Sequence, residues 1–325
     1  MVRKDRVPRA PTIYDVARVA EVSHQTVSRY LSGASPLRPA SRERVERAIQ
    51  ELGYRPSLTA RMLARGESRT VVALTGELLE VGTVQLVEGV RRAARAAGYL
   101  LDVMTYDADD LERTLTTIGR QDVAGVLAIA DTDQLREAVG RLSPDLLVTV
   151  TEDTPAAHTV EAHHAVARHL IELGHDRVTY VAGPRDWCSA RTRLRAFEEA
   201  FTGLDSERLF AAGWSAASGH EAGRRLRNPT AVVCANDQIA LGVTRALAER
   251  GRHVPADVSV VGYDDMPEAA YFSPPLTTVR QDFALHGAHA FRRVLERLEP
   301  DVPREPLPAV EDHLIVRGST AVRRA

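Results

Sequence analysis

The segment from Ser23 to Arg29 concentrates side chains that can hydrogen-bond to nucleic acid. Gln25 carries an amide that can bond bidentately to adenine, and Arg29 carries a guanidinium that can do the same to guanine. The hydroxyl groups of Ser23, Thr26 and Ser28 can bind phosphate oxygens and so fix the register of the protein on a duplex. This chemistry favours the reading of base pairs in a DNA major groove.

Two short helices and a tight turn are expected to position these side chains. Thr12, a candidate DNA contact, can also cap the first helix, with Asp15 three residues later closing a capping box. A turn at residues 21–22 then leads to a second helix, capped by Ser23 and running from about His24 to Leu31. On this helix the residues expected to face outward are His24, Gln25, Ser28 and Arg29. A solvated helix in a small bundle would show the same polar face, so the pattern alone leaves both interpretations open.

A third helix completes a compact head over residues 1–56. We expect Ser41 to cap it and Gly53 to end it, with an inward face made of Val45, Ala48, Ile49 and Leu52. Residues 57–65 form a helix too short to be stable alone, so we assign residues 57–69 to a hinge and linker.

From Val71 onward, short apolar runs alternate with helical segments, which is typical of parallel α/β sheets. We predict strands at 71–74, 100–104, 123–129, 146–150, 178–181, 231–235, 258–261 and 276–279. About 250 residues exceed one such sheet, so we expect two doubly wound subdomains with a ligand cleft at the carboxyl ends of their strands. The expected boundaries are 70–155 with 281–305 for the first subdomain and 156–280 with 306–320 for the second.

The charges divide sharply between the two parts of the chain. Residues 1–69 hold 14 basic against 7 acidic residues, a net of +7, whereas the rest holds 28 against 37, a net of -9. A basic head on an acidic body indicates contact with nucleic acid or an anionic membrane surface.

The chain closely resembles the lactose/galactose repressor (LacI/GalR) family of bacterial transcription regulators, and within it the lactose-repressor-like members. The resemblance runs from about Thr12 to Arg317. It is carried by the helix-turn-helix segment and by the motifs Tyr54–Ala64, Leu173–His175, Ala182–Pro184, Ser189–Arg193, Ala235–Gly242, Pro255–Asp265 and Pro275–Phe283. It implies an all-α head on a core like the periplasmic binding proteins, and the function of a sequence-specific repressor.

For the head, the resemblance implies base reading by His24, Gln25 and Arg29. It also implies a hinge helix that orders on operator DNA, with contacts from Ser57, Ala60 and Leu63 and with Leu63 as a minor-groove wedge. One departure is Glu21, which stands where the family usually has glycine. If this residue takes a positive φ, the glutamate costs about 1 kcal/mol.

For the core, the resemblance implies a small-molecule effector in the cleft, usually a sugar or a nucleobase. The matching residues are Ser189, Arg193, Trp214, Asn236, Asp264 and Phe283, with Trp187 as a possible second aromatic platform. An arginine, a carboxylate and an aromatic face suit a saccharide. Departures at Gly76, Glu80, Thr149 and His158–Thr159, and a shortened loop at 151–157, argue against a lactose-type ligand in an identical pose.

Reading a pseudo-palindromic operator requires two heads, so we expect a homodimer. The nine residues after Val316 carry no leucine heptads, which argues against a tetramer. The histidines at 163, 164, 169 and 175 are expected to be core or solvated residues, and Cys188 and Cys234 buried thiols, so we expect no metal and no cofactor.

Two other classes of protein fit less well. A sugar-binding transport protein would need a signal peptide, and it would not explain the head. An enzyme is not supported, because the sequence lacks Gly-x-Gly-x-x-Gly after a strand, Gly-x-x-x-x-Gly-Lys and Gly-x-Ser-x-Gly. With no apolar run long enough to span a membrane, we expect a cytoplasmic protein.

Overall fold

The computed structural model describes residues 11–32, 37–54, 68–76, 81–107, 109–129, 132–141, 148–150 and 157–323. The chain separates into two units, Met1–Ser68 and Arg69–Ala325. Each unit has its own hydrophobic core. We call them the head and the core unit.

In its described residues the head contains the helices α1 (Ile13–Val19), α2 (His24–Ser32) and α3 (Pro39–Leu52). Their inward faces bury one apolar cluster, whose fully buried members include Val16, Val27, Val45 and Ala48. Residues spaced three or four apart supply this cluster from each helix, as the helical period requires. The predicted helix-turn-helix arrangement is therefore confirmed.

The predicted caps of the head are confirmed at two helices and wrong at the third. Thr12 and Asp15 form the capping box of α1, and the Ser23 hydroxyl accepts a hydrogen bond of 3.1 Å from the backbone N–H of Thr26. Ser41 does not cap α3, because this helix begins two residues earlier at Pro39 and has Arg38 at its N-cap position. Proline suits the first helical position, where its missing N–H has no partner to lose.

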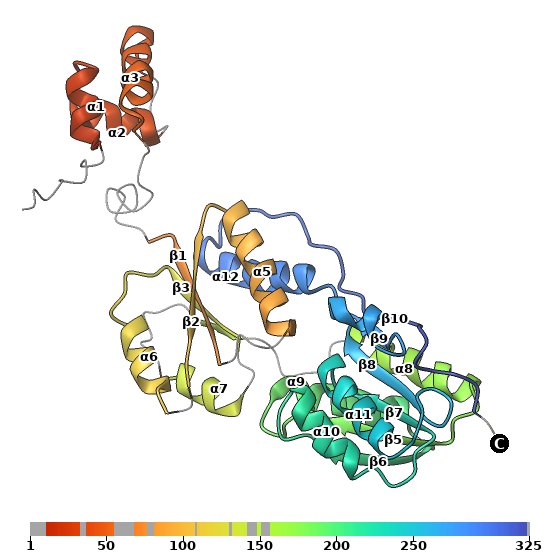
Figure 1. Ribbon diagram of the computed structural model, residues 1–325. Helices are drawn as coiled ribbons and strands as arrows, with labels where there is room; N and C mark the ends of the chain where they lie inside the picture. The colour runs from red at the N-terminus through yellow and green to blue at the C-terminus, as the bar shows by residue number, and fades with distance from the viewer. Residues whose placement is uncertain are drawn as a thin grey trace, which may run out of the picture. The chain divides into compact units, whose positions relative to one another are not determined.

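The first sheet of the core unit has the strand order β2-β1-β3-β4, with all neighbouring strands parallel. The strands are β1 (Thr70–Thr75), β2 (Leu100–Thr105), β3 (Gly125–Ala128) and β4 (Val148–Val150), and the helices that join or cover them are α5 (Val81–Ala96), α6 (Leu111–Ile118), α7 (Asp133–Val139) and α12 (Phe283–Leu298). Alternate residues of β1 and β3 feed two separate cores. One core packs against α5 and α12 and the other against α6 and α7, so helices cover both faces (Figure 1).

The second sheet has the order β10-β9-β8-β7-β5-β6, and only β10 is antiparallel to its neighbour. Its strands are β5 (Arg177–Ala182), β6 (Asp205–Phe210), β7 (Ala231–Cys234), β8 (Ser259–Asp264), β9 (Thr277–Arg280) and β10 (His313–Ile315), and its helices are α8 (Ala157–Glu172), α9 (Cys188–Ala200), α10 (Ala216–Arg224) and α11 (Asp237–Glu249). Strands β6 and β10 were not predicted. The fold class, an α-helical head with two parallel α/β subdomains, is confirmed.

The chain crosses three times between the two sheets. It leaves β4 for α8, returns from β9 to α12, and passes back from α12 to β10. In the described part of the chain, no helix has the length and apolar character needed to cross a bilayer.

Candidate functional site

Helix α2 presents the side chains that the sequence analysis assigned to DNA reading. His24, Gln25 and Arg29 are exposed, and the ring of His24 lies 5.3 Å from that of Tyr14 on α1. Tyr14 is 66% exposed and was not among the DNA contacts predicted from the sequence. The structure therefore adds an aromatic neighbour to the predicted face.

The hydroxyl groups of Ser23, Thr26 and Thr12 are already hydrogen-bonded within the head. The Ser23 hydroxyl lies 2.9 Å from that of Thr26, while Ser28 is partly exposed. Thr12 donates its hydroxyl to Asp15 Oδ2 at 2.7 Å and accepts from the Asp15 N–H, so it acts first as a helix cap. These bonds from Thr12 hold the pKa of Asp15 below its usual range.

The turn before α2 places Glu21 at a φ of +50°, in the left-handed region. Glutamate is less stable than glycine in this conformation, so Glu21 carries the predicted free-energy cost of about 1 kcal/mol. The predicted hinge contacts Ser57, Ala60 and Leu63 lie outside the described residues, as do Glu80 and residues 151–156.

One cavity of the core unit is lined from both subdomains and has a free volume of about 570 Å³ including its mouth. All seven predicted effector residues line it: Trp187, Ser189, Arg193, Trp214, Asn236, Asp264 and Phe283. Five further lining residues were missed: Val81, Gly82, Thr83, Leu86 and Ile129. Ile129 directly follows β3, and this position at the carboxyl end of a parallel strand was the available signal.

The polar centre of the cavity is an ion pair between Arg193 on α9 and Asp264 at the end of β8. Arg193 Nη2 lies 2.9 Å from Asp264 Oδ1, and both side chains are largely buried. Gln281 Nε2 donates to the same carboxylate oxygen at 2.7 Å. Burial raises the pKa of Asp264 above the ordinary carboxyl value, and Arg193 limits that rise. Arg193 Nη1 also donates to the Ala235 carbonyl at 2.5 Å, so the pair offers a ligand the remaining guanidinium N–H groups as donors and the second oxygen of Asp264 as an acceptor.

Asp264 is held in an unusual backbone conformation, with a φ of +107°. A non-glycine residue rarely adopts this angle, and such strain is concentrated at ligand-binding and active sites. Asn236, which follows β7, caps α11 by accepting from the Ile239 N–H at 2.7 Å, and its amide donates to the Trp214 carbonyl at 3.2 Å. Strand ends and caps thus fix the polar wall of the cavity.

Aromatic rings form the apolar walls of the cavity. The rings of Trp187 and Trp214 meet edge to face with 5.7 Å between centroids, and Phe283 lies on the α12 side. A Cβ at Gly183 would come within 2.6 Å of the Trp214 ring, so only glycine allows this packing. The indole N–H of Trp214 is buried and has no hydrogen-bond partner in the described part of the chain.

The two cysteines and the histidines at 163, 164 and 175 are buried or solvated, as the sequence predicted. Cys188 and Cys234 are buried free thiols. His163 is buried, hydrogen-bonds to the Thr159 carbonyl at 2.8 Å, and has its pKa lowered to about 4 by burial. His175 is buried as well, whereas His164 is exposed.

Comparison with known proteins identifies both parts of the chain. Residues 12–57 match the bacterial regulatory proteins of the lacI family, and residues 167–320 match the periplasmic binding protein-like domain. The lactose operon repressor of Escherichia coli (strain K12) is 35% identical over 88% of this chain and 84% of its own length. A transcriptional repressor PurR of Vibrio atlanticus (strain LGP32) is 31% identical over 89% of this chain and 92% of its own.

Solved structures agree with these relatives. The Lac repressor dimer bound to operator and the anti-inducer ONPF superposes with a TM-score of 0.82 at 31% identity, covering 96% of this chain and 100% of that one. A complex of the transcriptional regulator CelR with cellobiose gives a TM-score of 0.68 at 30% identity, covering 95% of this chain and 99% of that one. The likeness extends over the head and the core unit alike.

Proposed function

The chain belongs to the lacI family of bacterial regulatory proteins and is a DNA-binding transcriptional repressor, and on this premise we propose that a small saccharide controls its operator binding. The saccharide binds in the cavity between the two subdomains of the core unit. The controlled genes then serve carbohydrate utilisation. Such a protein acts in the cytoplasm, where its operator is.

The chemistry of the cavity carries this proposal. Arg193 and Asp264 offer adjacent donors and acceptors, which is what neighbouring sugar hydroxyls need. The rings of Trp187, Trp214 and Phe283 offer faces to the C–H side of a pyranose. The unpartnered indole N–H of Trp214 can find an acceptor in a bound hydroxyl. The neighbour whose structure holds cellobiose supports the same ligand class.

A nucleobase effector is the alternative, because members of this family usually bind a sugar or a nucleobase in the cleft. Two indole rings in the cavity are flat surfaces on which a purine can stack. The saccharide is preferred because a carboxylate and a guanidinium in one pair match vicinal hydroxyls better than they match a planar ring edge.

On the DNA side, we propose that α2 enters the major groove and that His24, Gln25 and Arg29 read bases there. Ser23, Thr26 and Ser28 contact phosphates, and the hinge residues Ser57, Ala60 and Leu63 contact the minor groove. A pseudo-palindromic operator requires two heads, so the active form is a homodimer, as in the Lac repressor dimer bound to operator.

A thermal-shift panel of mono- and disaccharides and purines tests the effector class. A saccharide that binds the folded core should raise the melting temperature, because at 100 times its Kd a ligand stabilises the native state by about 2.7 kcal/mol. Asp264→Asn should remove that shift, because its amide cannot retain the charged pair with Arg193.

Asp301→Asn is the matched control, because Asp301 is an exposed carboxylate outside the cavity. Trp187→Phe is a second test that does not depend on the stability of Asp264→Asn. It keeps the ion pair between Arg193 and Asp264, and it should reduce the rise in melting temperature that the saccharide causes. A panel in which only purines raise the melting temperature contradicts the saccharide proposal.

A further inference from the structure

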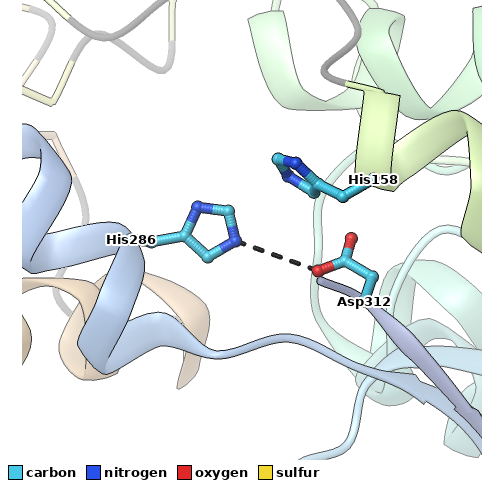
Figure 2. Close-up of side chains that lie close together, drawn as sticks. All are labelled: His158, His286 and Asp312. Carbon is cyan, nitrogen blue, oxygen red and sulfur yellow. Dashed lines mark ion pairs between the residues drawn. The ribbon is translucent and has the colours of Figure 1, made fainter. Parts of the chain in front are cut away.

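Three ionisable side chains outside the effector cavity meet at the crossings between the two subdomains (Figure 2). His158 stands in the first turn of α8, His286 in the first turn of α12, and Asp312 directly before β10. Each residue therefore lies beside a different one of the three crossings. One potential ligand atom of each lies within 4.8 Å of the other two.

Two atoms of this cluster have unmet bonding capacity. His286 Nε2 and Asp312 Oδ1 face each other across 3.9 Å, which is too far for a hydrogen bond (Figure 2). Both atoms are buried and have no hydrogen-bond partner in the part of the chain that the structure describes. Because unpartnered buried polar atoms are costly, this gap points to a ligand held between them.

The donor set fits a transition-metal ion. Two imidazoles and a carboxylate are common zinc ligands, and a tetrahedral ion with bonds near 2.0–2.1 Å holds its ligand atoms about 3.3 Å apart. Small side-chain rotations would close the 3.9 Å gap to that value. The His158 ring, whose centroid lies 5.1 Å from that of His286, is placed to supply the third ligand. Water would fill the remaining position.

We propose that His158, His286 and Asp312 form a transition-metal site of the zinc class that ties the three subdomain crossings together. An ion bound there restrains the motion of one subdomain against the other, because its ligands come from α8, α12 and the segment entering β10. The proposal does not depend on the nature of the effector.

The proposed site is connected to both walls of the effector cavity. The Tyr263 hydroxyl donates to Asp312 Oδ2 at 2.8 Å, and the Arg193 guanidinium lies 4.3 Å from the centre of the Tyr263 ring. On the other side, the ring of Phe283 lies 6.3 Å from that of His286, one turn along α12. Tyr263 thus orients the carboxylate ligand as the outer partners of metal ligands do.

Zinc titration of the full-length protein without an affinity tag tests the site. We expect one equivalent of Zn²⁺ to bind with a competitor chelator present, and Co²⁺ to show visible ligand-field absorption. His158→Gln and His286→Gln should each weaken binding on the order of 100-fold, because removing a ligand costs at least as much as the 10- to 100-fold loss seen for outer partners. His313→Gln is the control, since this neighbouring histidine is exposed and outside the cluster.

The proposal is overturned if the parent binds Zn²⁺ no more tightly than the double variant His158→Gln/His286→Gln, or if His313→Gln loses as much affinity. Circular dichroism of each variant shows that the fold is retained. The titration contains neither DNA nor saccharide, so its failure would leave the proposed function standing, and failure of the saccharide panel would leave the metal site standing.

Tryptophan emission supplies a second readout. The sequence holds two tryptophans, Trp187 and Trp214, and both line the effector cavity. Zn²⁺ should change their emission in the parent and not in the double variant. Bound Zn²⁺ that leaves the emission of the parent unchanged would contradict the restraint on the subdomains.

Discussion

Asp237, the first residue of α11, shows how strongly burial perturbs a single carboxyl group beside the effector cavity. It is 1% exposed, and it accepts hydrogen bonds from the Thr278 hydroxyl at 2.5 Å and the Met266 N–H at 2.8 Å. Burial and the nearby charge of Asp264 raise its pKa to about 8. The folded protein therefore holds a proton at Asp237 under conditions in which the unfolded chain has lost it.

This shift predicts a pH-dependent stability. Because the folded pKa lies above the unfolded value of 3.8, the contribution of Asp237 is fully present below pH 3.8 and is lost as the pH rises through about 8. Within that window the free energy of unfolding of the parent should fall by up to about 1.4 kcal/mol per pH unit relative to Asp237→Asn.

Urea unfolding of the parent and of Asp237→Asn at pH 5.5, 6.5, 7.5 and 9 measures the difference. Asp301→Asn serves as the control because its carboxylate is exposed. Equal pH dependence in the parent and Asp237→Asn would show that the carboxyl group is ionised in the native state.

At the scale of single residues, the cavity positions that the family resemblance marks could be predicted, whereas the other lining residues and the long-range neighbours could not. Asn236 and Asp264 fall in sequence motifs at the ends of strands, and Arg193 falls in a motif within α9, so all three could be assigned to the cavity. Val81 and Leu86 carry side chains that are equally suited to any core. His158 and His286 lie far apart along the chain, and only the return of α12 to the first sheet brings them together.

At the scale of elements, strands that form a continuous apolar run could be predicted, whereas β6 and β10 could not. The first strand, β1, is apolar along its length because both its faces are covered, and its position is readily recognised. β6 and β10 are edge strands with polar or exposed positions, so neither gives a continuous apolar run. Helix α3 begins earlier than predicted because Pro39 suits its first position. Ser41 therefore lies inside the helix and does not cap it.

Helix α2 carries the prediction that belongs to this scale. Arg29→Ala should weaken binding to the operator by about 1 to 3 kcal/mol and reduce discrimination at one base pair, because a bidentate contact to guanine would be lost. Fluorescence anisotropy with a labelled palindromic duplex and with single-base variants measures both effects.

Arg44→Ala is the matched control for Arg29→Ala, since Arg44 is an exposed arginine on α3 outside the proposed reading face. If Arg29→Ala binds as tightly and as selectively as the parent, α2 does not read bases through this residue.

At the scale of the whole molecule, the division of charge acquires a specific meaning. The net charge of +7 over residues 1–69 suits a head that meets phosphates, and its binding should weaken steeply with salt. The net charge of -9 over the remaining residues suits a sensor unit that does not itself bind DNA. Charge alone allowed a membrane partner, whereas the family and the helix-turn-helix make duplex DNA the partner.

Control of operator binding by the proposed saccharide requires that a ligand in the core unit and an operator on the head influence each other. Such coupling is reciprocal, and 1 to 3 kcal/mol is typical of it. The cavity must therefore bind the saccharide with different affinity in the operator-bound and free states. A saccharide that binds both states with the same affinity, however tightly, would not change the affinity for the operator.

The most direct test is an operator titration of the full-length dimer, followed by fluorescence anisotropy, with and without a saturating amount of the saccharide that raises its melting temperature. We predict a change in operator Kd of roughly 5- to 150-fold for the parent and for Asp301→Asn, and no change for Asp264→Asn, which lacks the charged pair in the cavity. An operator Kd that stays the same for the parent when the saccharide saturates the cavity would contradict control of operator binding by a saccharide.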